Sequence, residues 1–250
     1  TVNVNNLLGI ANTGAALNIS GGILTLGAGT ASGTLAPLTI SGGTLNLNTG
    51  NALTLAGTTT LSGGSVLGGS DNVTVTGAFN WANATITGSG SFTTTGTSTL
   101  SGTGDKTLTN RTWNNQGTVD LTAGRLNQNG AGSVFTNQAT GVVNVSTNNI
   151  SSIIGNLGSF TNAGILNMNT LGANDLGSGL AAFNNSGTVN VNSGALRLTT
   201  GGSDTGLYAV DSGTTIEFAN GARNLNAGSN VTGLGTLTVS GGSTVNVNNL

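Results

Sequence analysis

The same heptapeptide stands at both ends of this chain, and such repetition narrows the folds open to it more than any other feature. Residues 1–7 read Thr-Val-Asn-Val-Asn-Asn-Leu, residues 244–250 repeat them letter for letter, and residues 188–192 repeat the first five. A tandem array of long units would produce these matches, and so would low complexity in a chain rich in Thr, Asn, Val and Gly. Short repeats that cannot bury an apolar face alone fold by stacking on their neighbours.

The composition predicts strands throughout. Of 250 residues, 44 are Gly, one is Pro and only 5% are charged, while 36% are hydrophobic. Disordered chains are usually highly charged, and collagen needs abundant Pro, so neither class fits. Short runs of Val, Leu, Ile and Thr between Gly, Asn and Ser turns are typical of β-strands, where Pro is avoided because it cannot donate to the ladder.

Four segments in the middle of the chain share one pattern: aromatic-x-Asn, then Gly, then apolar-polar-apolar. The aromatic residues are Trp113, Phe135, Phe160 and Phe183; the amides are Asn115, Asn137, Asn162 and Asn185; the glycines are Gly117, Gly141, Gly164 and Gly187. Successive aromatic residues lie 22, 25 and 23 positions apart, a period typical of solenoids. We therefore expect an inward aromatic ladder, a ladder of amides that bond to one another, and glycines with positive φ at the turn.

The fold class predicted is all-β: a parallel β-helix, or β-solenoid, with about three strands and ~20–25 residues per coil. Apolar-polar-apolar triplets recur along nearly the whole chain, as at 45–47 and 237–239, and alternation turns their apolar residues inward. At ~4.8 Å per coil, roughly eleven coils make a rod on the order of 50 Å long. The bias of parallel crossovers favours the right-handed form. An antiparallel sandwich is the alternative, but it does not need like residues at one position of each unit.

This repeat pattern resembles that of secreted bacterial β-helix surface proteins: autotransporter passengers, filamentous-haemagglutinin-like exoproteins and proteins with autotransporter-associated strand repeats. The segments that carry the resemblance are 41–47, 183–191 and 233–242. The resemblance implies export, an extracellular or cell-surface location, and roles as stalks, adhesins or fibre components. The resemblance also implies a secretion domain and a translocator, which we expect to lie outside residues 1–250. Residues 1–250 are then one continuous solenoid, a segment or one tandem repeat of a longer fibrous protein.

The residues that usually perform catalysis are scarce. There is no His and no Cys, and the seven acidic residues are scattered, so we predict no catalytic, cofactor-binding or metal-binding residue and no enzyme activity. Arg197 and Glu217, about one coil apart, are interpreted as a surface ion pair rather than part of a glycosidase-like site. The Gly-rich segments 68–71, 201–204 and 102–107 are interpreted as turns, not as calcium or phosphate sites. With no basic patch and no long apolar run, neither nucleic-acid binding nor membrane insertion is expected.

We expect a structural, non-enzymatic segment of a surface fibre. Its end strands, marked by Val2, Val4, Val245 and Val247, have no visible polar cap, so we predict self-association through the solenoid ends or continuation in a longer chain. The alternative is an adhesin whose partners are surface glycans.

Tyr208 or Trp81 would recognise those glycans if exposed, although scarce aromatic residues more commonly pack in the core. A less favoured alternative is ice binding by the Thr-x-Thr triplets at 74–76, 85–87, 93–95, 97–99 and 107–109, whose offsets in the sequence are irregular.

Overall fold

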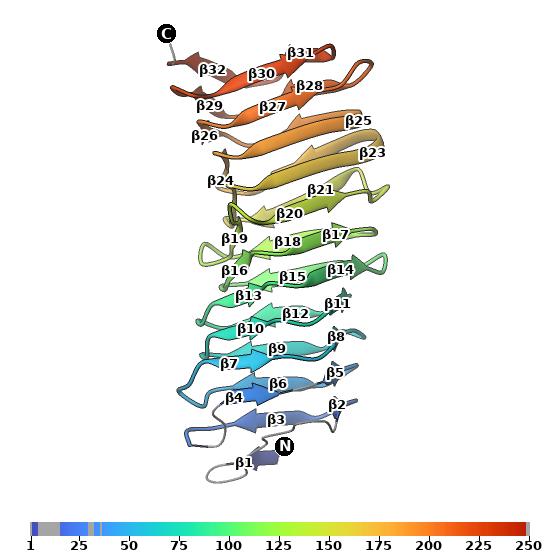
Figure 1. Cartoon of the computed structure of the whole chain (residues 1–250), viewed down its shortest axis with the longest axis vertical. Helices are drawn as coiled ribbons and strands as arrows, with labels where there is room; N and C mark the ends of the chain where they lie inside the picture. Colours follow the sequence, from blue (N-terminus) through green and yellow to red (C-terminus); the bar gives the residue numbers. More distant parts are fainter. Residues whose placement is uncertain (1, 5–15, 30–32, 36, 249–250) are drawn as a thin grey trace.

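The structure is a computed structural model that describes residues 2–4, 16–29, 33–35 and 37–248. Within these residues there is no helix, and the strands form one sheet of 21 strands and a second of 11. The strands stack along one axis, with β1 at one end of the rod and β32 at the other (Figure 1). The fold is a parallel β-solenoid of about 11 turns with roughly 21 residues per turn, which confirms the predicted fold class. Its handedness stays a prediction.

Each turn contributes one strand to each of three columns, which we call columns 1, 2 and 3. The 21-stranded sheet contains columns 1 and 2, and the 11-stranded sheet is column 3. Column 1 comprises β2 (Leu17–Ile19), β5 (Leu38–Ile40), β8 (Thr59–Leu61), β11 (Phe79–Ala82), β14 (Thr97–Ser101), β17 (Thr118–Leu121), β20 (Val142–Val145), the first parts of β23 (Ile165–Leu176) and β25 (Thr188–Leu198), β27 (Leu207–Val210) and β30 (Asn230–Gly233).

Column 2 comprises β1 (Val2–Val4), β3 (Ile23–Leu26), β6 (Thr44–Leu47), β9 (Val66–Gly69), β12 (Thr85–Thr87), β15 (Asp105–Thr109), β18 (Arg125–Asn129), β21 (Ser151–Asn156), the second parts of β23 and β25, β28 (Thr215–Phe218) and β31 (Thr236–Val239). Column 3 comprises β4 (Gly33–Leu35), β7 (Leu53–Leu55), β10 (Val73–Val75), β13 (Phe92–Thr94), β16 (Thr112–Asn115), β19 (Val134–Asn137), β22 (Ser159–Asn162), β24 (Ala182–Asn185), β26 (Gly202–Asp204), β29 (Ala222–Leu225) and β32 (Thr244–Val247).

Every pairing between these named strands is parallel, so the antiparallel sandwich is wrong. Coil length varies: Thr74 lies opposite Thr93, 19 residues on, whereas Asn137 lies opposite Asn162, 25 residues on. The corners between columns absorb this variation while the strands keep their register. Offsets in the sequence therefore understate how regularly the side chains are stacked.

One continuous hydrophobic core fills the centre of the solenoid. In most strands the two ends of an apolar-polar-apolar triplet are buried and the middle residue is partly exposed, as in β7, β10 and β28. This alternation is what a strand with one face toward a core requires. Because each coil covers the next, apolar residues in the middle of the rod are almost fully buried.

The three copies of the sequence Thr-Val-Asn-Val occupy three different columns. Of the first copy, residues 2–4 form β1 of column 2; residues 188–191 fall in the column 1 part of β25, and residues 244–247 form β32 of column 3. The strands of all three columns present one side to the core and the other to solvent. The same alternating sequence is therefore compatible with each column. The repeated sequence thus specifies a strand and does not specify where in the coil that strand lies.

Candidate functional site

Column 3 gathers the four aromatic residues of the repeat into one stack inside the solenoid. They stand at one register position and are fully buried: Trp113, Phe135, Phe160 and Phe183. Their ring centroids lie 4.5, 4.9 and 5.1 Å apart in sequence order. Phe92 extends the stack by one coil with an edge-on contact at 6.3 Å. These separations are typical of attractive ring pairs, so the stack ties five successive coils together.

Two residues beyond each ring, the amides form a second ladder in the same column. The side-chain Nδ2 of each Asn donates to Oδ1 of the next at 2.8 Å, in the series Asn115, Asn137, Asn162 and Asn185. Each Nδ2 also donates to a backbone carbonyl of column 1 in the neighbouring coil, at 3.0 to 3.2 Å. All four side chains are fully buried. The ladder therefore ties the end of each column 3 strand to column 1 of the neighbouring coil.

The prediction that the four repeat glycines have positive φ is wrong. None of them is among the residues with positive φ. Glycine is required there because the coils approach closely: a Cβ on Gly164 would lie 2.2 Å from the Gly141 carbonyl oxygen, and one on Gly187 would lie 2.1 Å from that of Gly164. A Cβ on Gly117 would meet the Gly96 oxygen at 2.2 Å. The stacked glycines thus let the chain turn directly against the coil below.

A buried ion pair that the sequence did not indicate ends both ladders. Asp204 stands opposite Asn185, accepts that residue's backbone N–H at 3.0 Å, and pairs with Arg223 Nη1 at 2.6 Å. The Arg223 guanidinium lies 5.6 Å from the centroid of the Phe183 ring and also donates to Tyr208 Oη at 3.2 Å. Burial raises the pKa of Tyr208 well above its usual value. The Asp204–Arg223 ion pair, the Phe183 ring and the Tyr208 hydroxyl therefore form one cluster inside the core.

A second buried cation lies lower in the rod. Arg111 is almost fully buried and donates to the carbonyls of Asp71 at 2.6 Å and Thr87 at 2.9 Å. Burial lowers the pKa of Arg111 to about 10, and the charge of Asp71 opposes that shift. The Asp71 carboxylate accepts hydrogen bonds from the backbone of Thr49 and Gly50 in the coil below. The segment that ends at Asp71 thus forms a corner of the coil, whereas the prediction that 201–204 is a turn is wrong, because Gly202–Asp204 forms strand β26.

Lys106, which follows the turn in the segment that superficially resembles a phosphate loop, points inward. Its side chain is fully buried, and Nζ donates to the carbonyls of Gly102 at 2.7 Å, Gly104 at 3.2 Å and Ala123 at 2.5 Å. Burial lowers its pKa to about 8, and Asp105 opposes that shift. The three carbonyls use the donors of the ammonium group, so this lysine fastens two neighbouring corners of the coil.

Three partly exposed ion pairs of the described residues lie on the outside of column 2, and one joins Arg125 to Asp105. Arg197 lies between Asp175, at 2.8 Å, and Glu217, at 3.0 Å, so the predicted pairing of Arg197 with Glu217 is present. Arg223 does not join this row, because it is buried against Asp204. Such exposed pairs contribute about 0–1 kcal/mol each, and this row is stabilising at most modestly.

The two aromatic residues considered for glycan recognition are both inside. Trp81 and Tyr208 have no exposed surface, and Trp81 Nε1 donates to the Ala84 carbonyl at 3.0 Å. Both pack against other rings of the core. Any recognition of a ligand by the described surface must therefore use other side chains.

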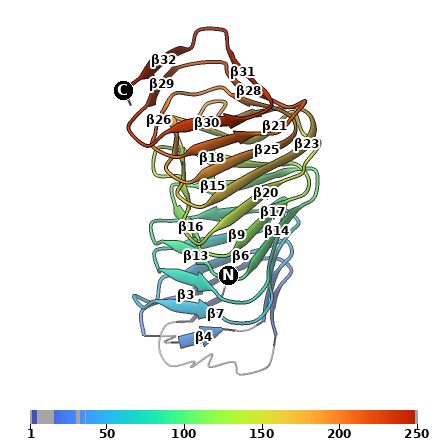
Figure 2. The same cartoon turned by 45° about the horizontal axis from the view of Figure 1, so that its top comes forward.

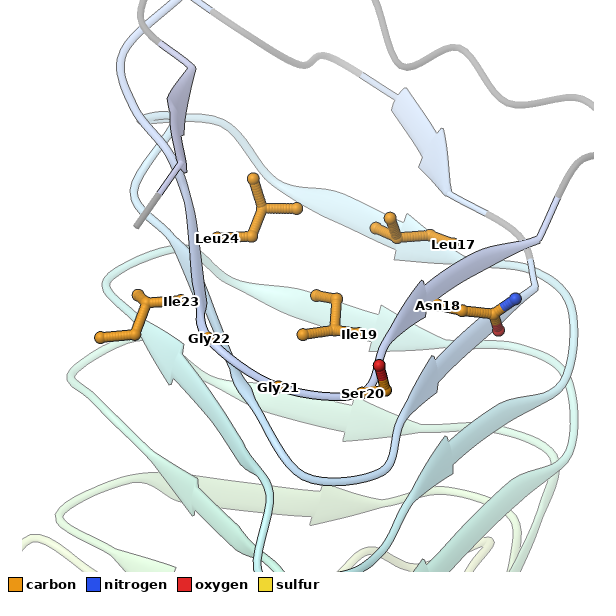
Figure 3. Close-up of a pocket in the computed structure, with 8 residues that line it drawn as sticks. All are labelled: Leu17, Asn18, Ile19, Ser20, Gly21, Gly22, Ile23 and Leu24. Atoms are coloured by element: carbon orange, nitrogen blue, oxygen red, sulfur yellow. The ribbon is translucent and has the colours of Figure 1, made fainter.

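The described surface has hollows near β1 and at a corner between columns 1 and 2. The one near β1, about 330 Å³, lies where β2 turns into β3, and Figure 3 shows Leu17, Ile19 and Leu24 pointing into it while Asn18 and Ile23 point away. A hollow of about 300 Å³ is lined by neutral polar residues that include Thr122, Thr147 and Asn149. Neither hollow brings two carboxylates together.

Val2 and Val4 belong to β1, and Val245 and Val247 to β32, which are the outermost described strands of columns 2 and 3; that these strands stack on further copies stays a prediction. In β1 the backbone of Val2 stands opposite Leu24 and that of Val4 opposite Leu26, and the side chains of β1 lie outside the described part. At the other end Val245 and Val247 belong to β32 and stand opposite Arg223 and Leu225. In this last coil, seen in Figure 2, Leu237 is 45% exposed and Val239 and Val247 are each 55% exposed.

Among the described residues, no group of three or more His, Cys, Asp or Glu side chains is placed to hold a metal ion. The described residues also include no helix long and apolar enough to cross a membrane. No family model, curated protein or solved structure matches the chain.

Proposed function

We propose that this chain is a structural, non-enzymatic β-solenoid segment of a bacterial cell-surface or extracellular fibre. The observation that carries the proposal is the single uninterrupted stack of about 11 turns, in which like residues bond to like residues along the axis. A rod of this kind spans distance in proportion to its number of coils and leaves little flexible backbone for proteases. The resemblance to secreted β-helix surface proteins supports the extracellular location.

The exposed end of the stack supports a second part of the proposal, namely that a further coil covers it. In the last coil Leu237 and Val239 occupy the inward positions that Ile216 and Phe218 hold one coil earlier, where the exposed fraction is 0% and 1%. Among the described strands, β30, β31 and β32 each pair on one side only, and the free edge of a strand is a template for further strands. The covering coil belongs either to a longer chain or to another copy.

Two measurements test this function. Antibodies against the solenoid should label intact cells of the source organism, and labelling only after cell lysis would contradict the surface location. The purified chain is then followed by sedimentation velocity over a wide range of concentrations. Assembly that grows with concentration and is weakened by Val239→Asp supports stacking between copies. A monomer at every concentration contradicts stacking between copies and favours continuation in a longer chain.

A further inference from the structure

The charged residues are distributed unequally around the solenoid. All twelve lie in the described part of the chain, and five of them, Asp71, Lys106, Arg111, Asp204 and Arg223, are buried. The seven with exposed surface lie on columns 1 and 2 or at the corner between them: Asp105, Asp120, Arg125, Asp175, Arg197, Asp211 and Glu217. The outward face of column 3 therefore carries no charge along the whole stack.

The middle of that face is a row of hydroxyl and amide groups, and small apolar side chains such as Val134, Ala182 and Ala222 lie beside it. The outward residues in the middle of successive column 3 strands follow one another along the axis. The steps between them are set by strand register or, between Asn184 and Ser203, by the hydrogen bond from the Ser203 backbone N–H to Asn184 Oδ1 at 2.8 Å. Every one of the eleven is Thr, Asn or Ser: Thr34, Thr54, Thr74, Thr93, Asn114, Thr136, Thr161, Asn184, Ser203, Asn224 and Asn246. We call these eleven residues the column 3 file. A strand spacing of ~4.8 Å gives this row of side chains a length on the order of 50 Å. Column 1, by contrast, has Asp120 and Ala209 at the equivalent positions.

Bonds between neighbouring side chains hold parts of the array in place. Asn246 donates to Asn224 at 2.8 Å, Asn226 donates to Ser203 at 2.8 Å, and Gln138 donates to Asn114 at 3.2 Å. Side chains fixed in this way lose less conformational entropy when a ligand binds. Thr, Ser and Asn can each donate and accept, so the face can meet the same mixture of groups on a ligand.

We propose that the outward face of column 3 binds an extended, neutral polysaccharide that runs along the solenoid axis. Sugar hydroxyls donate and accept as Thr and Asn do, and an uncharged polymer loses no ion hydration against an uncharged face. One coil advances by about the length of one sugar ring, so a chain lying along the file meets a similar group at each step. Many weak contacts in one molecule then add up to useful affinity, which removes the need for an exposed aromatic residue. This role would be additional to that of a spacer.

The test is retention of the purified chain in native gels that contain hydroxyethyl cellulose, dextran or galactomannan, with anionic alginate as the comparison. One variant, Thr54→Lys/Thr93→Lys/Thr161→Lys, places three long side chains on the column 3 file, where they stand out from the face and prevent flat contact. The matched variant, Thr39→Lys/Thr99→Lys/Thr232→Lys, places the same change at outward middle positions of column 1. Circular dichroism and melting curves check that both variants fold.

We expect at least one neutral polysaccharide to retard the wild-type chain, and the retardation to persist near 1 M NaCl, where charge interactions are screened within ~3 Å. The column 3 variant should lose at least tenfold in apparent affinity, and the column 1 variant should keep it. Four results would overturn the proposal: no retardation by any neutral polysaccharide, retardation by alginate alone, equal loss in the two folded variants, or thermal hysteresis without retardation, which would assign the face to ice.

Discussion

The inner amide ladder offers the sharpest test of how the rod is held together, because the chain also contains an outer amide ladder with the same bond lengths. Inside, Asn162 donates to Asn185 Oδ1 at 2.8 Å and to the Thr188 carbonyl at 3.1 Å, and it accepts from Asn137 at 2.8 Å. Outside, on column 1, Asn167 donates to Asn144 Oδ1 at 2.8 Å and accepts from Asn190 at 2.8 Å. The two positions differ in burial and in the bonds from Asn162 Nδ2 to the backbone carbonyls of Thr188 and Gly164.

Asn162→Ala removes about three hydrogen bonds worth ~1 kcal/mol each and leaves the Asn185 amide oxygen buried without the donor that it has in this structure, at ~1–3 kcal/mol. The expected loss in free energy of unfolding is therefore about 4–6 kcal/mol. Asn167→Ala breaks the same kind of bond at a partly exposed site where water replaces the lost partner, so its cost should stay below about 1 kcal/mol.

Urea unfolding followed by circular dichroism measures both variants. Because solenoids need not unfold in one step, hydrogen exchange should accompany it and show faster exchange in β22 and its neighbours in Asn162→Ala. Equal losses in the two variants, or a loss under about 1 kcal/mol for Asn162→Ala, would refute the view that the buried ladder stabilises the stack.

Three further outcomes are expected. Arg223→Met leaves the Asp204 carboxylate buried without its cation and should cost about 3–5 kcal/mol in urea unfolding, with much of the loss recovered when Asp204→Leu is added; a double variant no better than the single one would contradict this. Gly187→Ala should be far more destabilising in thermal melts than Gly213→Ala. Gly213 has positive φ, but a Cβ added there would meet no atom within 4 Å, whereas one on Gly187 would collide with the neighbouring coil. Similar melting temperatures for the two variants would show that contact between coils is not the constraint. The pKa of Lys106 is about 8 in the folded chain and near 10.5 in the unfolded chain. Between these pH values the unfolded state binds one more proton than the folded state, so the free energy of unfolding should rise with pH across that range. Lys106→Met should abolish this rise, and an unchanged pH profile would contradict the burial of the lysine.

The sequence was sufficient to predict the parallel solenoid because its evidence is local and repeated. Alternation in triplets defines strands, and the spacing of Trp113, Phe135, Phe160 and Phe183 defines a coil. Like residues one period apart are then brought together by any stack with parallel register, which is why the same positions form columns in the structure.

Other features depend on contacts between coils and could not be predicted in this way. Gly187 avoids the oxygen of Gly164, a constraint that is invisible without the neighbouring coil. Asp204 and Arg223 interrupt the ladder with a buried pair, although charged residues are usually on the surface. The row of Thr, Asn and Ser on column 3 could not be seen in the sequence, because coils of different length give irregular offsets. In the structure Thr74 nevertheless stands directly opposite Thr93.

The measurement that tests the central claim most directly is electron cryo-microscopy of native surface material, combined with the intact mass of the polypeptide. The account predicts continuous thin fibres with an axial repeat of ~4.8 Å, and the mass then tells whether coils continue within one long chain or between copies of 24.2 kDa. Isolated short rods with no continuity between them would contradict the role of a fibre segment.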